Sequence, residues 1–219
     1  MATNANFPPY EYVEDGKIVG IDAEVAAKIA EKLGMELQIE DIEFGSIVAG
    51  VQTGKYDIGM AGMTVTDERL KSVNFSKSYA TGVQVVIVKS DSAISSIDDL
   101  TGKKIGVQQD TTGDIYASDT AENGGFGADN VTSYKSGAEA VSALTTGKVD
   151  AVIIDNEPAK SFVAANEGLK ILDTKYVEEE YAICISKDNE ELLTQINKAL
   201  EELINDGTVK TIVDKYIPA

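Results

Sequence analysis

The sequence predicts an α/β protein with two lobes, and three observations carry that prediction. Strand-like and helix-like segments alternate along almost all of the 219 residues, which is typical of helices layered on parallel sheets. The polar connection Lys89-Ser-Asp-Ser92 separates one such series from a second. The turn Thr53-Gly-Lys-Tyr-Asp57 is echoed by Thr146-Gly-Lys-Val-Asp150, and each is followed by an apolar strand and a polar loop. Open α/β sheets bind ligands beyond the carboxyl ends of their strands, so the repeated turn predicts one binding edge in each lobe. The alternative is that the two segments are unrelated uses of a common turn.

The first series predicts these elements in chain order. Asp22 is expected to cap a helix whose apolar face is Val25, Ile29 and Leu33 and which ends at Gly34. Residues 35–40 alternate between apolar and polar side chains and predict a strand. A short helix at 46–53, a strand at 56–60 and a helix capped by Thr66 follow.

The second series begins after the apolar strand 83–88. It contains a strand at 105–107, a helix at 112–121, a helix after the capping box Ser136-Gly-Ala-Glu139, a strand at 149–154 and a C-terminal helix that Gly207 ends. Cys184, the only cysteine, lies in an alternating run and is expected to be a buried, unreactive strand residue, so no intrachain disulfide can form.

Composition narrows the possible functions. The chain carries 37 acidic and 19 basic residues, for a net charge of −18. This charge repels phosphate backbones and anionic lipids, so we expect no nucleic-acid and no membrane-surface partner. It chiefly provides solubility, and it weakly favours cationic ligands. Histidine is absent, which removes the usual general base and the commonest zinc ligand. We therefore expect no catalytic residue, no metal and no cofactor.

Nothing in the sequence predicts a membrane anchor. No apolar stretch approaches the roughly 20 residues that span a bilayer, and we recognise no signal peptide, so any export signal is expected to have been removed or never included. Residues 1–4 read as the end of a β-strand whose beginning is missing.

The strongest candidate for a binding loop is the segment from Ala61 to Arg69. A strand ends there, small residues let the backbone approach a ligand, and Thr64 offers a hydroxyl. Arg69 follows with a planar fork that matches a carboxylate, although an isolated arginine is more often a surface residue. Asp155 ends a second buried strand, where it is either a helix cap before Glu157 or a counter-charge for an ammonium group. Arg69 and Asp155 together would hold both ends of a zwitterion.

A set of segments then resembles a known family. These segments are Asn4-Ala-Asn-Phe-Pro-Pro-Tyr10, Gly20-Ile-Asp22, Ala61-Gly-Met-Thr-Val-Thr-Asp-Glu-Arg69, Asn74-Phe-Ser76, Gly106-Val-Gln-Gln-Asp-Thr-Thr-Gly113 and Val149-Asp-Ala-Val-Ile-Ile-Asp155. As a set they resemble the polar amino-acid-binding proteins of ATP-binding-cassette (ABC) importers, solute-binding protein family 3, which include glutamine-, histidine- and lysine/arginine/ornithine-binding proteins. The resemblance covers essentially the whole chain.

The resemblance implies two Rossmann-like lobes joined by a two-strand hinge, the type II arrangement of periplasmic binding proteins. Lobe 1 would comprise residues 1–82 and 181–219, lobe 2 residues 83–180, and the hinge would lie near 80–84 and 178–182. A free polar L-amino acid would stabilise the closed form, which a membrane permease would recognise. The expected protein is an extracytoplasmic monomer, either periplasmic or a cell-surface lipoprotein with its signal removed.

The resemblance also implies the residues of the site. They are Asn4, Phe7, Phe44, Ala61, Gly62, Met63, Thr64, Arg69, Gln108, Thr111, Thr112 and Asp155. Arg69 would bind the ligand carboxylate with help from Thr64 and from backbone groups of Ala61 and Gly62, and Asp155 would bind the ammonium group. The two phenylalanines would flank the ligand side chain, with ordinary core residues as the alternative. The residues from 108 to 112 would complete the pocket.

Two departures from the family pattern bear on the ligand. Asn4 stands where relatives that prefer basic ligands often carry a carboxylate, and Asp110 replaces a frequent glycine. The amides of Asn4 and Gln108 suit glutamine, because an amide both donates and accepts hydrogen bonds. The net negative charge of the protein leaves arginine as an alternative ligand.

Two other function classes are compatible with the same fold. Dehydratases of cyclohexadienyl acids resemble it, but they need a placed general acid, and the chain has no histidine and no isolated acid at a suitable motif. A ligand-sensing module of a receptor or kinase is the other class, and nothing in the chain extends beyond two lobes.

Overall fold

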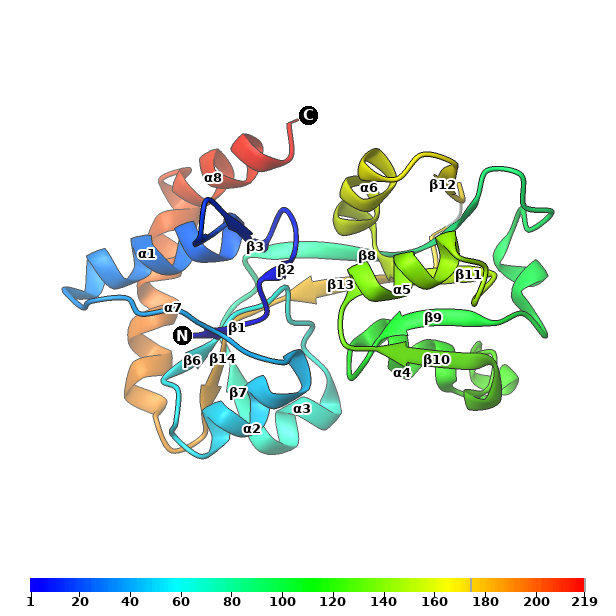
Figure 1. The fold of residues 1–219 in the computed structure, drawn as a ribbon. Coiled ribbons are helices and arrows are strands. Elements are labelled where there is room, and N and C mark those ends of the chain that lie inside the picture. Colours follow the sequence, from blue (N-terminus) through cyan, green and yellow to red (C-terminus); the bar gives the residue numbers. More distant parts are fainter. Residues whose placement is uncertain (174, 219) are drawn as a thin grey trace. The chain divides into compact units, whose positions relative to one another are not determined.

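The computed structural model describes residues 1–173 and 175–218, and the chain divides into two compact units. The first unit comprises Met1–Thr81 and Glu179–Ala219, and the second comprises Gly82–Glu178. The chain passes between them in two strands that pair with each other, β8 (Ala80–Lys89) and β13 (Val177–Tyr181). Both units contain a sheet flanked by helices (Figure 1), which confirms the predicted two-lobed α/β class.

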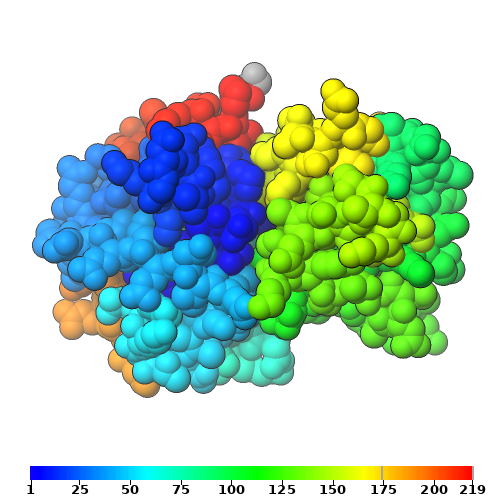
Figure 2. Space-filling model, viewed as in Figure 1, coloured from blue at the N-terminus to red at the C-terminus, as the bar shows by residue number. Residues whose placement is uncertain are grey.

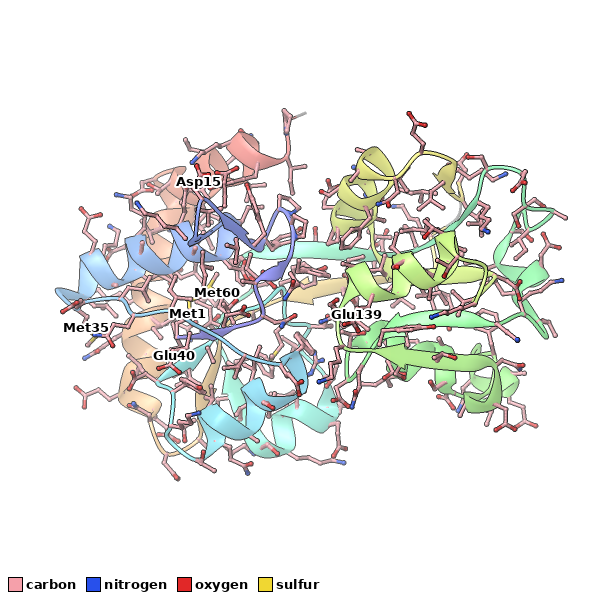
Figure 3. All side chains as sticks on the ribbon, viewed as in Figure 1. Met1, Asp15, Met35, Glu40, Met60 and Glu139 are labelled. Carbon is pink, nitrogen blue, oxygen red and sulfur yellow. The ribbon has the colours of Figure 1, made fainter. Side chains whose placement is uncertain are left out.

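The first unit is built on a five-stranded sheet in the order β5-β1-β6-β14-β7. Its strands are β5 (Glu40–Asp41), β1 (Ala2–Thr3), β6 (Ile58–Gly59), β14 (Cys184–Ser186) and β7 (Val73–Phe75). β1 runs parallel to both β5 and β6, whereas β14 is antiparallel to its neighbours. Figure 3 labels Glu40, the first residue of β5, together with Met1 and Met60, which directly flank β1 and β6 in the chain. A small antiparallel sheet, β2 (Asn6–Phe7), β3 (Glu11–Glu14) and β4 (Lys17–Val19), precedes the first helix.

The helices of the first unit cover its sheet. They are α1 (Ile21–Leu33), α2 (Ile47–Gln52), α3 (Asp67–Ser72), α7 (Glu190–Asn205) and α8 (Thr208–Tyr216), with the 3-10 turn η1 (Phe44–Ser46) before α2. α1, α7 and α8 pack against one another, and α2 packs on β1, β6 and β14. Figure 1 shows α2 and α3 across the sheet from α7. The core between them includes Ile47, Val51, Met63 and Cys184, so the predicted burial of the cysteine is confirmed.

The second unit is built on a six-stranded sheet in the order β10-β9-β11-β8-β12, with β13 also paired to β8. Its further strands are β9 (Ile105–Gln108), β10 (Val131–Tyr134), β11 (Ala151–Asp155) and β12 (Leu169–Ile171). β9 is parallel to β10 and β11, and β8 is antiparallel to β11. The helices are α4 (Thr112–Ser118), α5 (Gly137–Thr145) and α6 (Asn156–Ala165), and the 3-10 turns are η2 (Ile97–Leu100), η3 (Ala121–Asn123) and η4 (Ala128–Asn130).

Most of the predicted helix ends are confirmed. The Thr66 side chain caps α3, Ser136 caps α5, and Gly34 closes α1 in the left-handed conformation. The prediction for Asp22 is wrong, because Gly20 is the cap residue of α1 and Asp22 lies inside the first turn. Its carboxylate instead accepts a hydrogen bond from the backbone N–H of Gly62.

The predicted strand at 35–40 is also wrong for most of its length. Only Glu40 and Asp41 form a ladder, because the register sets Glu40 opposite Ala2 and leaves residues 35–38 without a strand opposite them among the described residues. Within residues 1–173 and 175–218, no helix is long and apolar enough to cross a membrane.

Candidate ligand-binding site

The predicted site residues of the first unit gather at one edge of its sheet. Asn4 follows β1, the loop from Ala61 to Thr64 follows β6, and Phe44 follows β5. These three strands are parallel, so their carboxyl ends meet at the same edge. In each unit a helix, a left-handed glycine and a strand lead to such an edge, with Gly54 at φ 74° and Gly147 at φ 75°. This confirms the prediction that the repeated turn lies between a helix and a strand in both units.

Arg69 is held in place by two neighbours. Its Nη1 donates a 2.7 Å hydrogen bond to the carbonyl oxygen of Thr64, and its guanidinium carbon lies 5.2 Å from the centroid of the Phe44 ring. The Arg69 side chain is half-buried. Arg69 is the only arginine in the sequence. A guanidinium stacked on an aromatic face and fixed by a carbonyl is a pre-oriented fork for a carboxylate.

The loop between β6 and α3 is fixed from the protein interior. Gly62 has φ 50°, and a Cβ atom on it would lie 2.8 Å from Cε1 of Phe7, so the Phe7 ring packs directly on this glycine. Met63 is fully buried and its carbonyl accepts a hydrogen bond from the N–H of Ala182 (3.1 Å). Thr64 forms an isolated bridge with Tyr181. The side chains of Ala61 and Met63 are core, which leaves only their backbone for a ligand.

The N–H of Gly62 is already bonded within the protein. It donates a 2.9 Å hydrogen bond to Oδ2 of Asp22, whose side chain is completely buried. Burial raises the pKa of Asp22 to about 6, while the bond from Gly62 and the side chains of Tyr79 and Glu11 act in the opposite direction. Asp22 was predicted only as a helix cap, so its contact with the binding loop is a feature that sequence reasoning missed.

Asn4 is buried and connects two parts of the same edge. Its Nδ2 donates a 2.8 Å hydrogen bond to the carbonyl oxygen of Ile42, two residues before Phe44. The neighbouring N–H of Ala5 donates to Asp41 (2.8 Å). Figure 2 shows the light-blue segment around residues 40–50 at the surface of the first unit, in agreement with the exposure of Glu43, Gly45 and Ser46.

The predicted site residues of the second unit also lie at the carboxyl ends of parallel strands. Gln108 ends β9 and is buried. The hydroxyl of Thr111 donates to the carbonyl of Gln108 (2.7 Å) and accepts from the N–H of Asp114 (3.3 Å), so this threonine caps α4. Thr112 is buried in the first turn. Asp110 lies at φ 63°, a conformation that glycine adopts without cost, which explains why glycine is frequent here.

Asp155 ends β11, and its carboxylate does not cap the helix that follows. It occupies the cap position of α6 but makes no side-chain cap bond. Instead, Oδ2 accepts a 2.8 Å hydrogen bond from Nε2 of Gln84, which lies opposite it on β8 and is completely buried. Sequence reasoning missed Gln84; the signal that could have found it is a glutamine inside the apolar strand 83–88.

Comparison with known proteins identifies the class. The model of the bacterial extracellular solute-binding proteins, family 3, matches residues 1–219. The arginine-binding extracellular protein ArtP of Bacillus subtilis is 33% identical over 219 residues, covering 99% of this chain and 84% of the relative. Among solved structures, an ancestral arginine-binding protein bound to arginine has a TM-score of 0.90 at 40% identity, covering 98% of this chain and 96% of the other. An ancestral arginine-binding protein bound to glutamine has a TM-score of 0.90 at 38% identity, covering 100% and 96%.

The chain therefore belongs to family 3 of the bacterial extracellular solute-binding proteins. The family resemblance read from the motifs is confirmed, and so is the prediction of a binding protein in place of an enzyme, since the relatives are binding proteins. This removes the dehydratase alternative. Among residues 1–173 and 175–218, no cluster of acidic or cysteine side chains is arranged to hold a metal ion.

Proposed function

We propose that this protein captures a free polar L-amino acid outside the cytoplasm and delivers it to the permease of an ABC importer. The observation that carries the proposal is the placement of two opposite charges, each fixed by its own unit. Arg69 is held by Thr64 and Phe44 in the first unit, and Asp155 is held by Gln84 in the second. A zwitterion presents a carboxylate to the first and an ammonium group to the second.

Both charged groups are oriented by contacts within their own units, and this favours binding. A charged side chain that is already oriented loses little conformational entropy when the ligand docks. A charged hydrogen bond in a desolvated site is also stronger than one in water, while an unpaired charge there is costly. The proposal therefore expects a ligand that carries both a carboxylate and an ammonium group.

The candidate ligands are L-arginine and L-glutamine. Three relatives whose names state a ligand support this choice: ArtP is an arginine-binding protein, and ancestral arginine-binding proteins occur in solved structures with arginine and with glutamine. The net charge of −18 favours the cation. The amides of Asn4 and Gln108 favour glutamine, although Nδ2 of Asn4 is bonded to Ile42.

The proposed mechanism is hinge closure. The lobes would be residues 1–82 with 181–219 and residues 83–180, turning about the strand segments 80–84 and 178–182. A ligand that bonds both lobes at once binds the closed form more tightly than the open form, so it shifts the population toward closure by that difference. The permease would recognise the closed form of a monomer located in the periplasm or anchored at the cell surface.

The test is calorimetric titration of ligand-stripped protein with L-arginine and L-glutamine, applied to wild type, Arg69→Ala and Asp155→Asn. Each substitution is expected to weaken binding by about 100-fold, because it removes one partner of a desolvated charge pair. Lys71→Ala is the matched control, because Lys71 lies on α3 with Arg69 and its ammonium group pairs with exposed Glu68. Unchanged affinity in Arg69→Ala would refute the assignment.

A further inference from the structure

Asp22 is a buried acid that the proposed binding contacts do not use. It lies in the first turn of α1 with none of its surface exposed to solvent, so water does not stabilise its charge. An uncompensated buried carboxylate is costly, so such a group needs specific partners. Its Oδ2 accepts a 2.9 Å hydrogen bond from the N–H of Gly62, in the loop that leads to Thr64 and Arg69.

Asp22 also joins a second candidate binding segment through its backbone. Its own N–H donates a 2.9 Å hydrogen bond to the carbonyl of Tyr10, and the preceding residue, Ile21, donates to the carbonyl of Pro9 (3.1 Å). These carbonyls belong to the turn that carries Phe7, whose ring packs on Gly62. One residue at the start of α1 therefore connects the Phe7 turn with the Gly62 loop.

The side chains of Glu11 and Tyr79 complete the surroundings of the Asp22 carboxyl group. Both are buried, and both belong to the first unit, as do Asp22 and Gly62. The cluster therefore encloses the carboxyl group that accepts the hydrogen bond from the Gly62 N–H.

We infer that Asp22 is a positioning residue for ligand binding: it holds the left-handed Gly62 and thereby places the carbonyl of Thr64 that orients Arg69. This inference rests on the proposed function. One residue, Met63, separates Gly62 from Thr64, and the Thr64 carbonyl accepts the 2.7 Å hydrogen bond from Arg69. Losing the acceptor at Asp22 would leave the Gly62 N–H buried and unpaired, so the loop would move to satisfy it.

The test compares Asp22→Ala with Asp22→Asn. Asparagine keeps an oxygen that can accept from Gly62, so Asp22→Asn is expected to bind L-arginine or L-glutamine within about threefold of wild type, whereas Asp22→Ala is expected to bind about tenfold more weakly or worse. Val25→Ala is the control for lost stability, because Val25 is fully buried on the same helix and belongs to neither loop. It should keep the wild-type affinity.

A second readout does not depend on the ligand. Amide hydrogen exchange of ligand-free protein should show faster exchange at Gly62 in Asp22→Ala and not in Val25→Ala. If Asp22→Ala does not fold, Asp22→Ser replaces it, because the shorter side chain also withdraws the acceptor. Wild-type affinity in the folded variant, or unchanged exchange at Gly62, would overturn the inference. Absence of binding in wild type would refute the proposed function, and the exchange at Gly62 would still decide whether Asp22 fixes the loop.

Discussion

The guanidinium carbon of Arg69 lies 5.2 Å from the centroid of the Phe44 ring, so the chain's only arginine is stacked on an aromatic face at the carboxyl edge of the sheet. The contact changes the role expected for Phe44. This ring supports the residue that we propose to bind the ligand carboxylate, in addition to any contact with the ligand itself. An arginine on an exposed helix without such support would spread over many rotamers.

The first prediction concerns this support. Phe44→Leu should weaken binding of the amino acid by about tenfold, because it keeps apolar contact and removes the cation–π attraction that fixes the guanidinium. The measurement is calorimetric titration beside wild type. Phe75→Leu is the control, because Phe75 packs against the same core cluster as Phe44 and has no proposed role at the site. Equal losses in the two variants would contradict the role given to Phe44.

The second prediction concerns Gln84. Gln84→Met should weaken binding by about tenfold, because the donor that orients the Asp155 carboxylate is lost while the volume of the buried side chain is nearly kept. Val86→Ala is the matched control, since Val86 is fully buried on the same strand and belongs to the core cluster. It should lower the free energy of unfolding and leave affinity unchanged. Wild-type affinity in Gln84→Met would show that Asp155 does not depend on it.

The third prediction compares two left-handed glycines of the first unit. Gly62→Ala should both destabilise the protein, by about 2–3 kcal/mol, and reduce affinity, because its Cβ would collide with the Phe7 ring and its φ of 50° is unfavourable for alanine. Gly54→Ala should cost about 1 kcal/mol from its φ of 74° alone, since nothing lies within 4 Å of the added Cβ. Urea unfolding and titration of both variants separate the two effects. Reduced affinity in Gly54→Ala would be unexpected.

The fourth prediction concerns pH. The pKa of Asp22 rises from 3.8 to about 6 on folding, so between these values the native state binds more protons than the unfolded state. The stability from this group is present below about pH 4 and is lost as the pH rises through about 6. Asp22→Asn removes the titration, so its free energy of unfolding relative to wild type should increase from pH 4 to pH 7, by on the order of 3 kcal/mol.

Urea unfolding of both proteins across that pH range measures the effect. The two proteins share all other carboxylates, so the contributions of those groups to the free energy of unfolding cancel in the comparison. Glu11 and Tyr79 face the same group and are kept in both proteins. A difference between wild type and Asp22→Asn that does not change with pH would contradict the prediction.

The sequence was sufficient for the fold and for most of the edge residues. Strand and helix periods, the repeated glycine turn and the motifs around Arg69 and Asp155 are local signals. The structure places the loop that leads to Arg69 at the carboxyl end of β6 and Asp155 at the carboxyl end of β11. The caps at Thr66 and Ser136 were also readable, because a cap and its partner are three residues apart.

The residues that support the site were not readable from the sequence. Asp22 bonds a group 40 residues away and Gln84 bonds one 71 residues away, so neither partner is visible locally. Asp22 also stands where a helix cap is expected, and Gly20 took that position instead. For Asp155, the sequence fits both a helix cap and a counter-charge for an ammonium group. The structure distinguishes the two, because the carboxylate makes no cap bond and accepts a hydrogen bond from Gln84.

The most direct test of the central claim is titration of refolded, ligand-stripped protein with the common L-amino acids, beginning with arginine and glutamine. Stripping is needed because a binding protein can retain its ligand through purification. The account predicts tight one-to-one binding of one polar L-amino acid, and loss of that binding in Arg69→Ala and in Asp155→Asn. Absence of binding to any amino acid, or binding that survives both substitutions, would contradict it.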